Sequence, residues 1–159
     1  MPMIDLTLPE GALRDDAKGR LVEELTTALL KWEGAPDNEV ARSLAWTYVD
    51  ERPAGAINVA GAPAQEPRYR VRVTVPEGAL DDERKAGLVA EVTERVLAAE
   101  GRPNEPAHAA RVWCIVREVR DGNWGGGGRI ARLKDIAQLI GATPDSVREA
   151  KRELVGERP

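Results

Sequence analysis

Residues 7–36 read TLPEGALRDDAKGRLVEELTTALLKWEGAP, and residues 74–103 read TVPEGALDDERKAGLVAEVTERVLAAEGRP. The two stretches share 16 of 30 residues without a gap, at an offset of 67 positions. The same offset aligns Trp46 with Trp113, well outside both stretches. Unrelated amphipathic helices would not share the PEGAL motif and a distant tryptophan in one register. We therefore infer that a unit of 67 residues is duplicated.

Each unit is predicted to form a strand, a helix and a second strand. Apolar residues alternate with polar ones over 3–8 and 70–75, as they do in half-buried strands. The residues after each PEGAL motif begin with acidic side chains, repeat apolar residues at helical spacing and end at a glycine, which is typical of an amphipathic helix. The apolar run VWCIV at 112–116 predicts a buried strand, and 44–49 is its counterpart in the first unit.

The fold class that follows from this pattern is α+β. Two strand–helix–strand units side by side give a four-stranded mixed sheet with both helices on one face, and the other face then needs cover from another subunit. Polar residues on that face predict a subunit contact with ion pairs. We expect a core domain at 1–133, made of pseudo-repeats 2–67 and 69–133, followed by a C-terminal helical extension at 134–159.

The composition narrows the classes of protein to which the chain can belong. The chain has 159 residues, a formal net charge of −4 and a pI of about 5.2, which does not favour general affinity for nucleic acids. Cys114 is the only cysteine, so no intrachain disulfide can form. The sequence shows neither a long apolar segment nor a signal peptide. We expect a cytoplasmic protein that binds neither membranes nor nucleic acids.

The chain begins with Met1 followed directly by a proline, and residues 112–130 read VWCIVREVRDGNWGGGGRI. Together with the duplicated unit, these features resemble the tautomerase superfamily, in particular the 4-oxalocrotonate tautomerase group, over residues 2–133. The segment DERPAGAINVAG at 50–61 resembles longer members, such as the cis-3-chloroacrylic acid dehalogenase and malonate semialdehyde decarboxylase groups. Those members fuse two units and form trimers, so the resemblance implies a homotrimer. We expect no cofactor and no metal.

Pro2 is the residue that the resemblance marks as catalytic. If Met1 is removed, Pro2 carries a free secondary amine. The pKa of such an amine is about 8 in model compounds and falls on burial, toward the range of a general base. Tyr69 stands at the same position of the second unit, where the nitrogen is a main-chain amide without basicity. The alternative is that Pro2 is an ordinary proline at the start of a strand.

The substrate-binding residues of the family are replaced at several positions. Its arginines fall on Ala12, Pro76, Ala79, Trp46 and Trp113, and the histidine of the dehalogenases falls on Leu29. The aromatic residue of the family's glycine-rich hairpin falls on Trp124, which is expected to form an apolar wall beside Pro2. We expect substrate contacts from two tryptophans and from the nearest cations, namely Trp113, Trp124, Arg111, Arg117 and Arg129. The alternative for each is a core or subunit-contact tryptophan, or a surface arginine in an ion pair.

The tail RLKDIAQLIGATPDSVREAKREL, residues 132–154, carries a competing motif. Ala137, Gly141 and Val147 have the spacing of a helix-turn-helix. However, five basic and five acidic side chains balance over 134–159, and no third supporting helix has room. We therefore expect a helical appendage that packs on the trimer.

These inferences combine into one functional hypothesis. The chain is predicted to be a tautomerase-type isomerase, in which Pro2 transfers a proton between the enol and keto forms of a small keto acid. A decarboxylase, hydratase or dehalogenase of the same superfamily is the first alternative. A non-catalytic trimeric or DNA-binding module that keeps the fold is the second.

Overall fold

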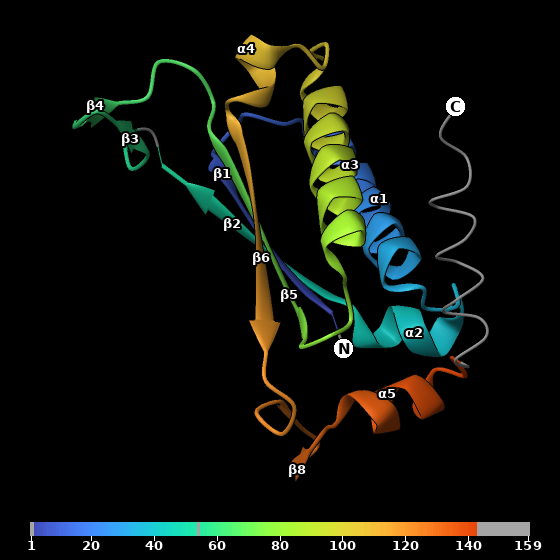
Figure 1. The fold of residues 1–159 in the computed structure, drawn as a ribbon. Helices are drawn as coiled ribbons and strands as arrows, with labels where there is room; N and C mark the ends of the chain where they lie inside the picture. Colours follow the sequence, from blue (N-terminus) through green and yellow to red (C-terminus); the bar gives the residue numbers. More distant parts are fainter. Residues whose placement is uncertain (1, 54, 143–159) are drawn as a thin grey trace.

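The computed structural model describes residues 2–53 and 55–142, and its fold is α+β, as predicted (Figure 1). The centre is a four-stranded mixed sheet with the strand order β2-β1-β5-β6. These strands are β1 (Met3–Pro9), β2 (Trp46–Arg52), β5 (Tyr69–Pro76) and β6 (Val112–Val119). Two long helices, α1 (Asp15–Glu33) and α3 (Asp82–Glu100), lie side by side on one face of the sheet (Figure 1).

The sheet consists of two parallel strand pairs that meet in an antiparallel one. β1 runs parallel to β2, β5 runs parallel to β6, and β1 and β5 run antiparallel at the centre. Asp5 pairs with Arg72, which is its own counterpart at the 67-residue offset. An approximate twofold axis therefore passes between these two residues, and equivalent residues of the two units lie at opposite ends of the sheet.

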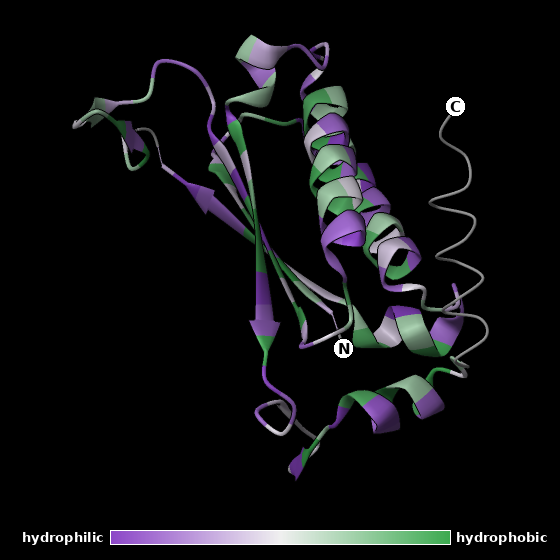
Figure 2. Ribbon diagram, viewed as in Figure 1, coloured by the Kyte–Doolittle hydropathy of each residue, from purple (hydrophilic) through white to green (hydrophobic). Residues whose placement is uncertain are grey.

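Alternate residues of the central strands form the core under the helices. The buried strand residues are Ile4, Leu6 and Leu8 of β1 and Val71, Val73 and Val75 of β5. They pack in one cluster with helix residues that include Leu21, Leu25, Leu88 and Val92. Burying each such side chain contributes roughly 1.5–3 kcal/mol. In Figure 2 both long helices carry hydrophobic residues on part of their surface and hydrophilic residues on the rest, as amphipathic helices do.

Both long helices end at a glycine, where the sequence predicted their ends. Gly34 and Gly101 have φ angles of 69° and 75°, the left-handed conformation that glycine adopts readily at helix C-termini. Their N–H groups bond back to carbonyl groups of the last helical turn. The last residue of α1, Glu33, is thereby held at the end of the sheet where β1 begins.

The shorter elements follow the duplication only in part. α2 (Glu39–Leu44) and α4 (Pro106–Ala109) precede the second strand of each unit at equivalent positions. Beyond those strands, the first unit has the hairpin β3 (Asn58–Val59) and β4 (Ala62–Pro63), whereas the second has the glycine-rich hairpin β7 (Gly125–Gly126) and β8 (Arg129–Ile130), followed by α5 (Leu133–Leu139).

α5 is the described part of the predicted C-terminal extension. Its Ile136 is buried. The second half of the helix-turn-helix motif, with Val147, lies outside the described residues. None of the helices in the described ranges is both long and apolar enough to cross a membrane.

The face of the sheet opposite the helices is open in the single chain. Asp5 and Arg72 form an ion pair of 3.8 Å at its middle, in line with the polar pattern of the sequence. Aromatic and apolar side chains flank this pair on the outer strands, namely Trp46, Tyr48, Ile115 and Trp113, which are 61%, 51%, 42% and 70% exposed. The face is therefore more apolar than the central strands alone indicated.

Candidate active site

Pro2 is buried and directly precedes β1. Its carbonyl oxygen accepts a hydrogen bond of 3.3 Å from the N–H of Trp46, which fixes Pro2 beside β2. At the equivalent position of the second unit, the N–H of Tyr69 donates to the carbonyl oxygen of Arg111 over 2.9 Å. A proline within a chain has no N–H to donate, so the sheet makes no use of the Pro2 nitrogen.

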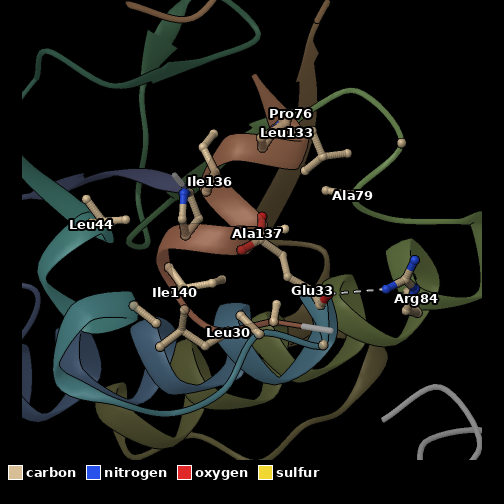
Figure 3. Close-up of a pocket in the computed structure, with 16 residues that line it drawn as sticks. Leu30, Glu33, Leu44, Pro76, Ala79, Arg84, Leu133, Ile136, Ala137 and Ile140 are labelled. Carbon is tan, nitrogen blue, oxygen red and sulfur yellow. Dashed lines mark hydrogen bonds between the residues drawn. The ribbon is translucent and has the colours of Figure 1, made fainter. Parts of the chain in front are cut away.

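Pro2 lines a cavity of about 430 Å³ at this end of the sheet (Figure 3). The walls come from the end of α1, from α2, from the loop after β5 and from α5. Most lining residues are apolar, among them Leu30, Leu44, Pro76, Ala79, Leu133, Ile136, Ala137 and Ile140. The volume suits a small molecule. Since α5 follows the duplicated units, the C-terminal segment completes a site that the first unit begins.

Glu33 brings a carboxyl group into this apolar cavity. Its side chain extends from the end of α1 into the space in front of α5 (Figure 3). Burial raises the pKa of the carboxyl to about 7, although the positive charges of the chain's N-terminus and of Arg84 act in the opposite direction. A carboxyl group with a pKa near 7 can both give and accept a proton at neutral pH.

Arg84 reaches the same region from α3 and is 7% exposed. Its Nη1 donates to the carbonyl oxygens of Trp32 and Glu33, over 3.4 and 3.3 Å. A cation is favourable at this position because the carbonyl end of a helix carries partial negative charge. Arg84 therefore holds the end of α1 in place, and with it the start of the Glu33 side chain.

Arg111, one of the predicted substrate ligands, lies at the opposite end of the sheet from Pro2. It is 3% exposed, donates two hydrogen bonds of 2.8 and 2.7 Å to the carboxylate of Glu100, and donates a third to the carbonyl oxygen of Pro67. The hydrogen-bonded Glu100 raises the pKa of Arg111. Because Glu100 and Pro67 already bind the guanidinium group of Arg111, the geometry favours the ion-paired alternative for this residue.

The other predicted ligands also lie outside the Pro2 cavity of the described chain. Trp113 lies near Arg111, and both line a second cavity of about 760 Å³, together with Arg52, Arg68 and Arg70. Arg117 lies at the same end of the sheet as Pro2 but on the open face. It pairs with Thr74 of β5, which pairs in turn with Met3 of β1. Trp124 is half-buried near the glycine-rich hairpin, and Arg129 is exposed on β8.

Glu33 and Arg84 are the site residues that the sequence did not single out. The signal that could have found Glu33 lies in the repeat. Glu33 and Glu100 are equivalent, but the equivalent of Arg111 in the first unit is Leu44. The first unit therefore has the glutamate of this pair but not the arginine, which indicates that the Glu33 carboxyl group has different surroundings from that of Glu100. Arg84 has no such signal, because its counterpart is Ala17 and its hydrogen bonds at the site go to main-chain oxygens.

The reactive groups of the cavity are acid–base groups. Over residues 2–53 and 55–142, no cluster of His, Cys, Asp and Glu side chains is arranged to hold a metal ion. Burial raises the pKa of the Cys114 thiol to about 11, so this thiol stays protonated at neutral pH and is a poor nucleophile. Glu33 is the lining residue whose side chain can exchange a proton near neutral pH.

Residues 70–133 match the family model of the tautomerase enzymes. Residues 70–133 therefore form a tautomerase-family unit. This match covers the second unit, and the tautomerase fold of the first unit follows from its duplication and from solved structures. No curated protein matches the sequence.

Solved tautomerase-superfamily structures share the fold across both units. N1, a member of the cis-3-chloroacrylic acid dehalogenase family, matches with a TM-score of 0.71 and 21% identity, over 97% of this chain and 99% of that chain. Pt0534, inactivated by 2-oxo-3-pentynoate, matches with a TM-score of 0.68 and 22% identity, over 81% and 94%. The F6 fused 4-OT, a wild-type asymmetric trimer, matches with a TM-score of 0.67 and 22% identity, over 81% and 95%. The predicted resemblance to the tautomerase superfamily is confirmed.

Proposed function

We propose that the protein is a tautomerase-type isomerase, in which Pro2 acts as general acid–base once Met1 is removed. In the reaction, the Pro2 amine takes a proton from one end of an enol–keto system, and a proton is returned at the other end. The substrate would be a small keto acid with an apolar substituent, because the cavity walls are largely apolar. A cytoplasmic location remains a prediction from the sequence.

The observation that carries this proposal is the placement of Pro2. It is buried, it lines a cavity of small-molecule size, and the sheet does not use its nitrogen. The apolar surroundings favour the neutral amine, which is the form that accepts a proton.

We propose further that the protein acts as a homotrimer. The F6, R7 and Q0 fused 4-OT structures are each described as trimers. This chain has an open sheet face that another subunit could cover, with exposed aromatic residues around the ion pair of Asp5 and Arg72. Trp113, Trp124, Arg117 and Arg129 remain candidates for substrate contacts across that interface, whereas Arg111 is the weakest, since Glu100 holds it.

A second candidate is a reaction of the cis-3-chloroacrylic acid dehalogenase type. N1, a member of that family, matches almost the full length of both chains. The Glu33 carboxyl in the Pro2 cavity is also a group that could activate water. Decarboxylase or hydratase chemistry with a protonated Pro2 belongs to the same alternative.

The experiment that tests the proposal combines mass spectrometry with a substrate panel. Mass spectrometry of the purified protein should show that Met1 is absent. The panel should contain the enol forms of phenyl-substituted and aliphatic keto acids, together with halogenated and unsaturated acids. We expect kcat/KM of Pro2→Ala to fall about 10²-fold, because the rigid secondary amine is lost. Pro9→Ala, at the other end of β1, is the matched control and should keep its activity. Intact Met1, or equal turnover by Pro2→Ala on every accepted substrate, would exclude the role of Pro2.

A further inference from the structure

The equivalent glutamates of the two units have different surroundings. Glu33 and Glu100 end the equivalent helices α1 and α3. In the second unit, Arg111 forms two hydrogen bonds with the Glu100 carboxylate, and Tyr69 fills the position equivalent to Pro2. In the first unit Leu44 replaces that arginine and lines the cavity instead. The first unit therefore combines an open cavity with a carboxyl group whose counterpart arginine is replaced by Leu44.

No other side chain in the described ranges neutralises the Glu33 carboxylate through an ion pair. Arg84 is the one other side chain with a formal charge among the lining residues, and its Nη1 bonds to the main-chain oxygens of Trp32 and Glu33. The residues that α2, α5 and the loop after β5 contribute to the wall carry no charge. The remaining charge that acts on Glu33 is that of the terminal amino group. Met1 carries this group in the full sequence, and Pro2 would carry it once Met1 is removed.

A half-buried carboxyl group with no ion pair among the described residues lowers the stability of the fold, because the apolar cavity removes part of its hydration. Core packing does not explain the unpaired state of Glu33 among the described residues. In the second unit the equivalent Glu100 forms an ion pair with Arg111. Groups that cost stability and lie in a cavity with a second reactive group are candidates for function.

We propose that Glu33 is the second acid–base group of the Pro2 site, and that it shares one proton with the Pro2 amine. This inference rests on the proposed function. In the step, the neutral Pro2 nitrogen takes a proton from one end of the enol–keto system, and the Glu33 carboxylic acid gives its proton to the other end. The substrate then has the same number of protons as before. Proton transfer from the Pro2 ammonium to the Glu33 carboxylate restores both groups.

The inference can be tested before the natural substrate is known. The probe is 2-oxo-3-pentynoate, the compound that inactivates Pt0534. The rate at which it labels Pro2 is measured against pH, with peptide mass spectrometry to locate the label. In Glu33→Gln the apparent pKa of Pro2 should fall by about one pH unit, because the carboxylate no longer stabilises the ammonium form. Glu39→Gln, an exposed glutamate on α2, is the matched control and should leave the profile unchanged.

A second readout uses any substrate that the panel identifies. Glu33→Gln should lower kcat about 10- to 100-fold with little change in KM, and should remove one limb of the pH profile of kcat. Glu33→Asp keeps a carboxyl group and should recover part of the activity. If Glu33→Gln does not fold, the same comparison is made with Glu33→Asp, whose shorter side chain should also shift the labelling profile.

The possible outcomes separate this inference from the proposed function. If the probe labels Pro2 and Pro2→Ala shows the expected loss of kcat/KM, but neither Glu33 variant changes the labelling profile or kcat, the role of Glu33 is wrong and that of Pro2 stands. If the probe does not label Pro2 and Pro2→Ala keeps full activity, the proposed function itself fails.

Discussion

The indole ring of Trp32 packs directly against the backbone of Gly87, where α1 and α3 cross. A methyl group built on Gly87 would overlap the six-membered part of that ring. The ring is also held in place, because Trp32 Nε1 donates to the carboxylate of Glu91 over 2.9 Å. Glycine is therefore required at position 87 for close approach of the two helices, whatever its lower helix propensity.

The first prediction follows from this contact. Gly87→Ala should lower the free energy of unfolding by about 1–3 kcal/mol, because the ring or the helix must shift. Gly19→Ala is the matched control, since Gly19 also lies within a long helix but has open space around it. That substitution should stabilise the protein by about 0.5–1 kcal/mol. Urea unfolding of both variants checks this, and equal effects of the two substitutions would contradict it.

The second prediction concerns the buried pair of Arg111 and Glu100, whose side chains are 3% and 8% exposed. Arg111→Met should lower the free energy of unfolding by about 3–5 kcal/mol, because it leaves the carboxylate buried without its cation. The double variant Arg111→Met with Glu100→Gln should recover part of this loss. A loss below 1 kcal/mol in Arg111→Met would show that the pair is of little structural importance and would reopen Arg111 as a substrate ligand.

The third prediction concerns the pH dependence of stability. Glu33 has a pKa of about 7 in the folded protein and an ordinary value of 4.5. Between these values the folded chain keeps a proton that the unfolded chain has lost, so the contribution of Glu33 to stability is fully present below pH 4.5 and is lost as pH rises toward 7. Relative to Glu33→Gln, the wild type should lose up to about 3 kcal/mol over this range. Denaturant titrations at several pH values check this, and parallel pH curves for the two proteins would rule it out.

The fourth prediction concerns assembly through the open sheet face. Light scattering should give a particle three times the mass of the 17.3 kDa chain. Ile115→Lys should weaken that assembly, because it places a charge in the middle of the buried interface. Val40→Lys is the matched control, since Val40 on α2 is exposed to a similar degree, 43% against 42% for Ile115. A monomeric wild type at micromolar concentration would refute the proposed trimer.

The fold could be predicted from the sequence because its evidence is local and occurs twice. The alternation of apolar residues, the glycine stops and the shared PEGAL motif specify the strands and helices, and the 67-residue offset pairs the units. Pro2 was available in the same way, since it stands directly after Met1. What remained a prediction is the role of Pro2, because a role depends on surroundings.

Those surroundings were decided by the tertiary structure. Glu33, Arg84 and Ile136 meet around Pro2 from three elements that are far apart along the chain, and no periodicity links them. The pairing of Arg111 with Glu100 was hidden for the same reason, so Arg111 looked like a free cation. Local patterns record which face of an element is apolar, whereas burial and charge at a site depend on long-range contacts. The sequence alone thus determined the duplicated architecture, and only the tertiary structure placed a carboxyl group that forms no ion pair within the described ranges in the cavity of Pro2.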